Sequence, residues 1–212
     1  MTRRGGAGEF HALALPETVA LEVWVFEVER PALVVGSAQR VEEVVDVEAC
    51  RAAGVEVVRR RSGGGAVLLE PGGIVWFDVI VPADRLRREG IGDDVAGSMV
   101  WLGKRVVAAL TELGIGDPVV HAGPMVTSPS SALVCFAGIG PGEVLVDGSK
   151  LVGISQRRTR AGARYQCAVH TRWSPDRLAE LLLARPSDLP DVATLPPAIG
   201  VALPGVVARS VS

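Results

Sequence analysis

The sequence predicts a single α+β domain built on a mixed, mostly antiparallel sheet. Many short segments are rich in β-branched and aromatic residues, as strands are, and only three segments repeat apolar residues at helical spacing. The helical segments interrupt runs of strands instead of alternating with them, which favours α+β over a parallel α/β sheet. The 212 residues contain no internal repeat and no interdomain linker. We therefore expect residues 1–212 to form one domain around one core.

The first half of the chain predicts five strands and one helix. Residues 1–10 carry arginines and glycines without a periodic pattern, and we expect them to be a frayed terminus. Glu42–Ala53 repeats apolar residues at helical spacing and stops before Gly54, a typical C-cap glycine. The strands expected in this half are Glu22–Val28, Ala32–Val35, Val55–Arg59, Ala66–Leu69 and Ile74–Val81.

The second half adds two helices and a series of short strands. Asp93–Leu113 has the strongest helical pattern, and Asp93 or Asp94 is the expected N-cap. Pro175–Leu183 is the other expected helix, and no clear periodicity follows from Ala184 onward. Strands are expected over Pro118–His121, Leu133–Ala137, Glu143–Val146, Leu151–Gln156 and Ala163–Val169, with a loop over Ala122–Ser131.

Composition argues against several classes of protein. A formal net charge of −2 does not suit a general nucleic-acid binder, and no run of about 18 apolar residues is present that would span a membrane. No apolar run of signal-peptide length follows Met1–Glu9. Cys50, Cys135 and Cys167 form no CxxC pair, which favours reduced thiols. We expect a cytoplasmic protein that binds neither nucleic acid nor a membrane.

An anion-holding loop is predicted at Arg59–Gly65, where three arginines precede a serine and three glycines. Each guanidinium offers a fixed fork of donors that suits phosphate or carboxylate oxygens. Glycine has no Cβ, so the backbone can take positive φ and bring its N–H groups close to a ligand. The loop lacks the Lys-Ser/Thr ending of a nucleoside-triphosphatase loop. A plain hairpin turn with solvated arginines stays open as the alternative.

A second motif, Asp147–Arg157, joins an Asp-Gly turn to a strand that we expect to begin at Lys150. A lysine beside a turn is most often an exposed surface residue, and we expect Lys150 to be exposed at the strand end. Among the 22 basic residues, however, only Lys104 and Lys150 are lysines. The presence of a lysine at this position indicates that a compact charge on a flexible stem is needed there.

Together the two motifs resemble the lipoate–protein ligase and octanoyltransferase family. Arg59–Gly65 matches its Arg-Arg-x-x-Gly-Gly-Gly segment, and Gly148–Gln156 its Gly-x-Lys-x-x-Gly-x-Ala-Gln segment, with Ser155 in place of alanine. Gly36–Gln39 matches a third segment, Gly-x-x-Gln. The resemblance covers about residues 20–185 and implies the fold of biotin and lipoate ligase catalytic domains, with an acyl tunnel beside the glycine loop. No separate C-terminal accessory domain is expected.

The resemblance also implies roles for individual residues. Lys150 would polarise the reacting carboxylate or thioester carbonyl, and Gln39 would border the same pocket. The loop would hold the acyl carboxylate and, in a ligase, the adenylate phosphate, since a developing oxyanion needs preorganised donors. We expect Lys150→Ala to abolish acyl transfer while the fold survives. The implied substrate-binding residues are Gln39, Arg60, Arg61, Ser62, Gly63, Gly64, Gly65, Gly153 and Ser155, and no metal ligand is implied.

Two departures from the family pattern bear on the mechanism. Leu68–Glu70 stands where an aromatic residue and His-Asp are usual, and Cys167–Val169 stands where His-Gly-Ser/Thr is common. A subgroup of the family transfers octanoyl groups through a cysteine placed before the lysine motif, and Cys135 has a comparable position. A small buried hydrophobe on a core strand is the other interpretation of Cys135.

Several functions therefore stay open. The main one is lipoate–protein ligase-like transfer through an acyl-adenylate, with ATP and Mg²⁺, to the lysine of a lipoyl domain in a 2-oxoacid dehydrogenase complex or glycine cleavage H protein. The alternative is an octanoyltransferase that takes its acyl group from acyl carrier protein onto Cys135 and needs no cofactor. Two non-enzymatic hypotheses also stay open: a non-catalytic lipoyl-binding protein, and a module whose arginines bind some other phosphate.

Overall fold

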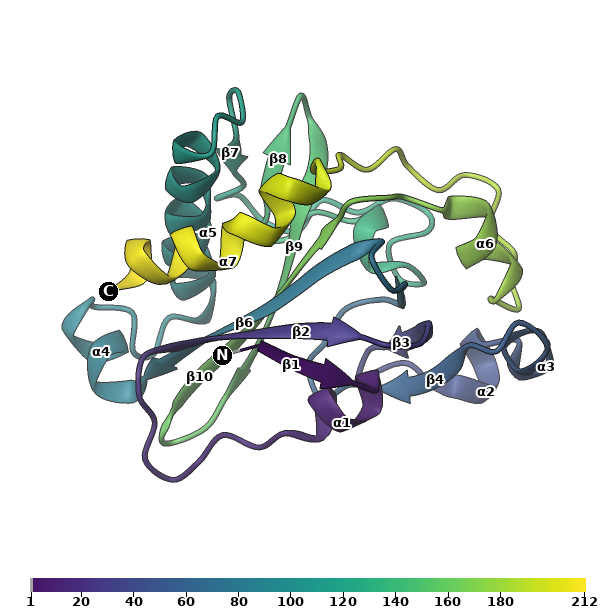
Figure 1. The fold of residues 1–212 in the computed structure, drawn as a ribbon, viewed down its shortest axis with the longest axis horizontal. Coiled ribbons are helices and arrows are strands. Elements are labelled where there is room, and N and C mark those ends of the chain that lie inside the picture. Colours follow the sequence, from purple (N-terminus) through teal and green to yellow (C-terminus); the bar gives the residue numbers. More distant parts are fainter. Residues whose placement is uncertain (1) are drawn as a thin grey trace.

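The computed structural model describes residues 2–212, which form an α+β fold around two sheets (Figure 1). The strands are β1 (Thr2–Gly5), β2 (Glu22–Val28), β3 (Ala32–Val35), β4 (Glu56–Arg59), β5 (Val67–Leu69), β6 (Ile74–Pro82), β7 (Val119–Val120), β8 (Val144–Val146), β9 (Ser149–Arg158) and β10 (Gly162–His170). The larger sheet has the order β1-β2-β6-β10-β9-β8-β7 and the smaller one β4-β3-β5. Paired strands are antiparallel except β1 with β2 and β3 with β4. The predicted mixed, mostly antiparallel sheet is confirmed.

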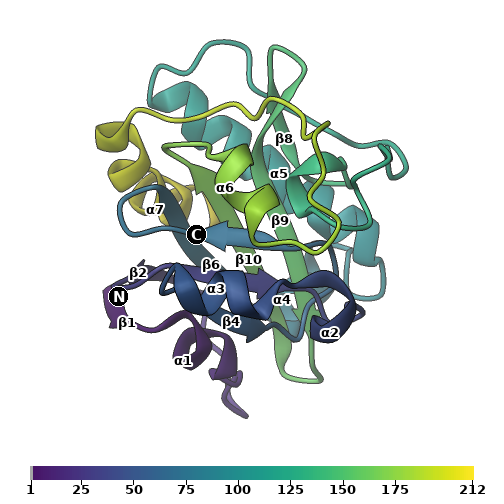
Figure 2. The same ribbon diagram turned by 90° about the vertical axis from the view of Figure 1, so that its right-hand side faces the viewer.

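Two long helices cover one face of the larger sheet, and the smaller sheet together with a short N-terminal helix covers the other. The helices are α1 (Ala7–Ala12), α2 (Val41–Val44), α3 (Val47–Ala52), α4 (Ala83–Arg88), α5 (Val95–Glu112), α6 (Pro175–Glu180) and α7 (Pro197–Val211), with a short 3-10 helix η1 (Cys135–Ala137). Figure 2 shows α5 and α7 on one side of β6 and β10, and α1 with β4 on the other. One apolar cluster packs under α5 and α7, and a second fills the space between the two sheets. Within residues 2–212, no helix combines the length and apolarity needed to cross a membrane.

Two predicted elements have a different local structure. The helix expected over Glu42–Ala53 is divided into α2 and α3, because Asp46 takes an extended backbone and its side chain accepts a hydrogen bond from the Ala49 N–H as the cap of α3. The strand expected over Leu133–Ala137 is the turn η1, attached to the chain before β5 by a bridge between Ala66 and Val134. The predicted helix near Asp93 is confirmed as α5, with Asp94 as its cap.

Both ends of the chain are more regular than the sequence suggests. The prediction of a frayed terminus over residues 1–10 is wrong for residues 2–10, which form β1 and most of α1; Met1 lies outside the described residues. Strand β1 pairs in parallel with β2, and Phe10 of α1 is buried against Phe26 and Trp76. At the other end, α7 buries Leu203 and Val207 in the cluster beneath α5. Its Pro204 and its small residues hide the helical pattern from sequence inspection.

A buried histidine makes stability depend on pH. His170 is 4% exposed between the rings of Phe136 and Trp173, and its Nε2 has no hydrogen-bond partner. Burial lowers its pKa from 6.5 to about 4. The ring is therefore neutral in the folded state at pH values where the unfolded chain protonates it. The contribution of His170 to the unfolding free energy is fully present above pH 6.5 and is lost as the pH falls toward 4.

We predict that His170→Phe removes part of this acid sensitivity. Between pH 7.5 and pH 5, the wild-type protein should lose about 2 kcal/mol more unfolding free energy than the variant. Urea unfolding at the two pH values measures the difference, and contributions from His11 and Asp78 cancel in the comparison. Equal losses in the two proteins would show that His170 is not held neutral by burial.

Candidate functional site

An apolar pocket lies between the two sheets and opens beside a wider groove. The pocket takes its walls from β3, β5, β6, β9 and β10, and the groove has a volume of about 620 Å³. In the larger sheet, Trp76 pairs with Ala168 and Ala168 with Gly153, so these three residues form one row across the pocket wall. Cys135 and Ser155 line both cavities. The apolar side chains of the pocket wall are Val34, Val67, Leu69, Trp76, Phe136, Ile154 and Ala168.

The glycine loop packs directly on the segment that carries Cys135. A Cβ at Gly65 would lie 2.6–2.8 Å from backbone atoms of Val134 and Cys135, and a Cβ at Gly64 would lie 3.4 Å from the Cys135 sulfur. Gly64 also has a φ of +98°, which glycine tolerates without strain. The glycines thus permit a close approach of the chain's own cysteine segment, whereas the expected approach of their N–H groups to a ligand stays a prediction.

Arg60 and Arg61 point to different places. Arg60 is 5% exposed, and its guanidinium donates to the carbonyls of Gly63, Gly65 and Val34. It also interacts with the Cys135 thiol, although burial lowers the pKa of the guanidinium overall. Arg60 thus braces the loop and places a positive charge beside the sulfur. Arg61 is exposed and lines a separate outer pocket, so the structure does not bring it into the groove.

Lys150 is buried, so the expectation of an exposed strand-end lysine is wrong. The side chain is 3% exposed, and its Nζ donates to the carbonyls of Cys135 (2.9 Å) and Gly138 (3.0 Å). A third bond, of 2.6 Å, is an ion pair with Glu143. The other carboxylate oxygen of Glu143 accepts the N–H of Gly140 at 2.7 Å. Lys150 lines the groove, and its bond to the Cys135 carbonyl fixes the cysteine segment.

Glu143 and His11 are site residues that sequence reasoning missed. Glu143 begins an otherwise apolar strand segment, and a lone acid there was the available signal. His11 lies in the terminus that was expected to be frayed, yet it lines the apolar pocket and stacks on Trp76. Burial, aided by the nearby charges of Arg60 and Arg164, lowers the His11 pKa to about 3, so the ring is neutral.

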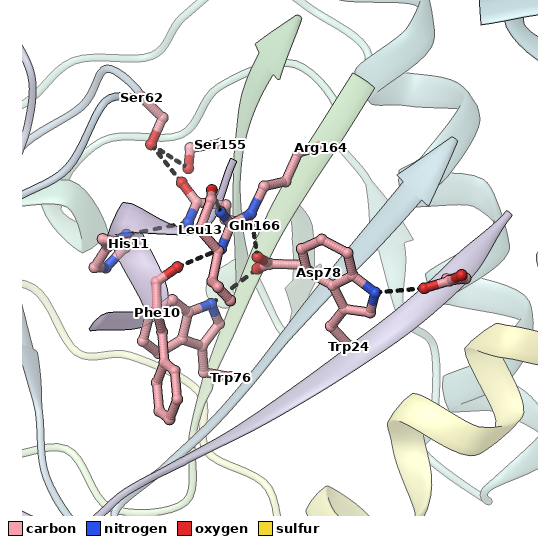
Figure 3. A network of polar contacts seen from close by, with 11 residues as sticks. Phe10, His11, Leu13, Trp24, Ser62, Trp76, Asp78, Ser155, Arg164 and Gln166 are labelled. Atoms are coloured by element: carbon pink, nitrogen blue, oxygen red, sulfur yellow. Dashed lines mark hydrogen bonds and ion pairs between the residues drawn. The ribbon is translucent and has the colours of Figure 1, made fainter. Parts of the chain in front are cut away.

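A polar chain connects this histidine to the loop (Figure 3). Ser155 donates to Ser62, Ser62 donates to the side-chain Oε1 of Gln166, and the Gln166 Nε2 lies 3.1 Å from His11 Nδ1. Alongside, Arg164 donates to the backbone carbonyls of Phe10 and Leu13 and pairs with Asp78. The N-terminal segment is thereby fixed as one wall of the pocket.

The remaining predicted site residues divide into two groups. Gly153 and Ser155 line the pocket, and Gly63, Gly64 and Gly65 line the groove beside Cys135 and Lys150. Ser62 lines neither cavity but is hydrogen-bonded to Ser155 and Gln166 of the pocket wall. Gln39 lines neither cavity: its amide accepts from the Gly36 N–H and donates to the carbonyls of Ala132 and Leu133. It acts as a cross-link beneath the loop. Its role at the border of the pocket stays a prediction.

The buried ion pair leads to a prediction about folding. Lys150→Met leaves the Glu143 carboxylate buried without its cation, and we expect a loss of about 3–5 kcal/mol in unfolding free energy. Adding Glu143→Gln should restore more than half of that loss, because no uncompensated charge stays inside. Chemical denaturation of the single and double variants measures both effects.

Lys104, the other lysine of the chain, provides the control for this experiment. It is exposed on α5, and Lys104→Met should change the unfolding free energy by less than about 0.5 kcal/mol. A stable Lys150→Met protein would contradict the buried pair and revive the earlier expectation that the fold survives removal of this lysine.

Comparison with known proteins agrees with this architecture. A family model described as the lipoyl protein ligase A/B catalytic domain matches residues 14–192. The octanoyltransferase LipM of Kyrpidia tusciae is 34% identical over 150 residues, which are 69% of this chain and 51% of that protein. LipM of Carboxydothermus hydrogenoformans is 30% identical over 154 residues, 72% of this chain and 54% of its own length. The chain thus spans about half the length of these curated relatives.

Solved structures share the fold at lower sequence identity. A putative lipoate protein ligase from T. acidophilum with bound lipoic acid has a TM-score of 0.65 and 18% identity, covering 89% of this chain and 71% of that one. Lipoate-protein ligase A bound with ATP has a TM-score of 0.62 and 21% identity, covering 81% and 62%. The predicted biotin/lipoate ligase-like fold is confirmed. With its matched residues 14–192, the chain belongs to the lipoyl protein ligase A/B catalytic-domain family.

Proposed function

We propose that residues 1–212 form a catalytic domain that transfers an octanoyl group through a thioester on Cys135 to the lysine of a lipoyl domain. The observation that carries the proposal is the position of Cys135, whose thiol lies where the apolar pocket meets the groove, next to Arg60. We thus favour transfer through Cys135 over transfer through an acyl-adenylate, which is the main expectation from the sequence. The similarity to octanoyltransferases supports the same choice.

Cys135 differs from the other two cysteines in its surroundings. Cys50 and Cys167 are 1% and 0% exposed inside apolar clusters, and burial raises the pKa of the Cys167 thiol. Cys135 is partly exposed and sits on the turn η1, not on a core strand. The Arg60 guanidinium lies beside its sulfur. These features favour a reactive cysteine over a packing residue.

The transfer would proceed in two balanced steps. The Cys135 thiolate attacks the carbonyl carbon of the donor thioester, the bond to the donor sulfur breaks, and the donor thiolate takes up a proton. The neutral amine of the acceptor lysine then attacks the acyl-cysteine carbonyl, the carbon–sulfur bond breaks to return the thiolate to Cys135, and the nitrogen releases one proton to solvent as the amide forms. The acyl chain would occupy the apolar pocket in both steps, since burial of its methylenes favours binding.

Lys150 would assist at the carbonyl oxygen. Its Nζ already has three acceptors, two of them backbone carbonyls, so it can donate to an oxyanion by exchanging one carbonyl for the substrate oxygen. The Glu143 carboxylate keeps the ammonium in place during that exchange. The role expected of Lys150 from sequence is thus retained as a proposal, with Glu143 as its positioning partner.

The donor groups of the groove fit a nucleotide less well. Among the described residues that line the groove, Lys150 is the cation, and it is already bound to Glu143. Arg60 is bound to loop carbonyls. We therefore derive no step through ATP and Mg²⁺, which belong to the competing ligase route. Acyl carrier protein is the proposed donor, and a lipoyl domain of a 2-oxoacid dehydrogenase complex or glycine cleavage H protein is the proposed acceptor.

We predict that an acyl-enzyme accumulates when the purified protein meets octanoyl-carrier protein without an acceptor. Intact-protein mass spectrometry should show one octanoyl group on the wild type and none on Cys135→Ser, because a serine hydroxyl is not ionised at neutral pH. Cys50→Ala should still acquire the group. Addition of an apo lipoyl domain should move the group from the wild-type protein to the domain.

A second reaction decides between the routes. Lipoate with ATP and Mg²⁺ should leave the lipoyl domain unmodified. Modification by both wild type and Cys135→Ser would refute the cysteine route in favour of the acyl-adenylate. No change in lipoyl-domain mass with either donor, although the domain is bound, would instead identify a non-catalytic lipoyl-binding protein.

A further inference from the structure

Arginines gather around a further cavity that the proposed chemistry does not use. Arg59, Arg61 and Arg157, together with Ser37 and part of Arg60, line a pocket of about 430 Å³, which we call the arginine pocket. No acidic residue lines it, although the chain carries 24 acidic residues and a net charge of −2. A cavity with one sign of charge attracts ions of the opposite sign.

The guanidinium groups of this pocket lack internal counter-charges. Within residues 2–212, the arginine ion pairs involve other arginines, and none joins Arg59, Arg61 or Arg157 to a carboxylate. Arg59 donates to the Ser37 carbonyl, which fixes its position. Its charge is felt by Glu42, but that carboxylate is bound to Arg40. The donors of Arg61 and Arg157 stay available to a ligand.

The arginine pocket adjoins the reactive site without being part of it. Arg60 is shared by the two: it lines the arginine pocket and the apolar pocket, where it lies beside Cys135. On β9, Gln156 lines the groove and the next residue, Arg157, lines the arginine pocket. A molecule bound at Cys135 and extending past the loop would therefore bring a distal group to these arginines.

We propose that the arginine pocket binds the phosphate of the acyl donor's phosphopantetheine arm. This inference rests on the proposed thioester chemistry, in which the donor sulfur ends an arm that is joined to its carrier through a phosphate. Guanidinium forks match phosphate oxygens in bidentate geometry, and several forks around one cavity strengthen that match. The phosphate would hold the arm in place while its thioester reaches Cys135.

The test compares two donors that differ only in the phosphate. Octanoyl-4′-phosphopantetheine should acylate the wild-type protein with a KM roughly tenfold lower than octanoyl-pantetheine, as expected for a charge-assisted contact. Arg157→Gln should lose most of this advantage, and the double variant Arg61→Gln/Arg157→Gln all of it. Acylation of Arg157→Gln by octanoyl-pantetheine should match the wild type. High salt should weaken the phosphate effect in the wild type.

Controls separate a local contact from a change in net charge. Arg51 and Arg209 are exposed on α3 and α7, outside the arginine pocket, and Arg51→Gln/Arg209→Gln removes the same charge as the double variant. It should keep the full phosphate advantage. Calorimetry with 4′-phosphopantetheine and pantetheine, which carry no acyl group, should show the same pattern of affinities without any chemistry.

Distinct outcomes overturn the inference and the proposed function. Equal KM values for the two donors in the wild type, or an undiminished phosphate effect in the double variant, would overturn the phosphate site. The double variant could instead show a raised KM for octanoyl-carrier protein and unchanged KM values for both small donors. That result would mean that the arginines contact an acidic face of the carrier protein, and it would overturn the proposal. Absence of acylation by either donor would refute the thioester chemistry, while the calorimetric comparison would still decide whether phosphate binds.

Discussion

The buried guanidinium of Arg60 is the interaction on which the site depends. A charge that is 5% exposed is costly unless its donors are satisfied, and here they bind carbonyls of the glycine loop and of β3. The same group therefore fixes the loop, ties it to the smaller sheet and sets the electrostatic surroundings of Cys135. The glycines complete the arrangement, because any Cβ at Gly65 would push the cysteine segment away.

Local patterns in the sequence were enough to predict much of this. Most strands of both sheets were predicted from alternating apolar residues and from β-branched residues, because the two-residue period of a strand is a local property of the sequence. The two motifs around Arg60 and Lys150 located the site for the same reason. What they could not show is the direction of each side chain. Arg60 turns inward and Arg61 outward, although they are neighbours, and the consecutive sequence carries no sign of that division.

The residues that were missed depend on partners far away in the chain. Glu143 became recognisable as a site residue only through its contact with buried Lys150. Strand β1 gains its order from β2, and α7 from the core beneath α5, so neither needs a strong pattern of its own. The break between α2 and α3 has a local cause in Asp46, but a capping aspartate inside a helical period is easily counted as a surface residue.

The wall of the pocket that contains His11 is fastened by a residue from the other end of the domain. Arg164 binds the carbonyls of Phe10 and Leu13 across 154 and 151 positions of sequence. A growing chain leaves the ribosome N-terminus first. The carbonyls of Phe10 and Leu13 therefore cannot bind the Arg164 guanidinium until β10 has been synthesised. A chain that ends before Arg164 already contains the thiol of Cys135 and the amine of Lys150, yet it lacks the residue that holds the His11 wall of the apolar pocket. Completion of the pocket therefore comes late in synthesis, after Cys135 and Lys150 have both been added to the chain.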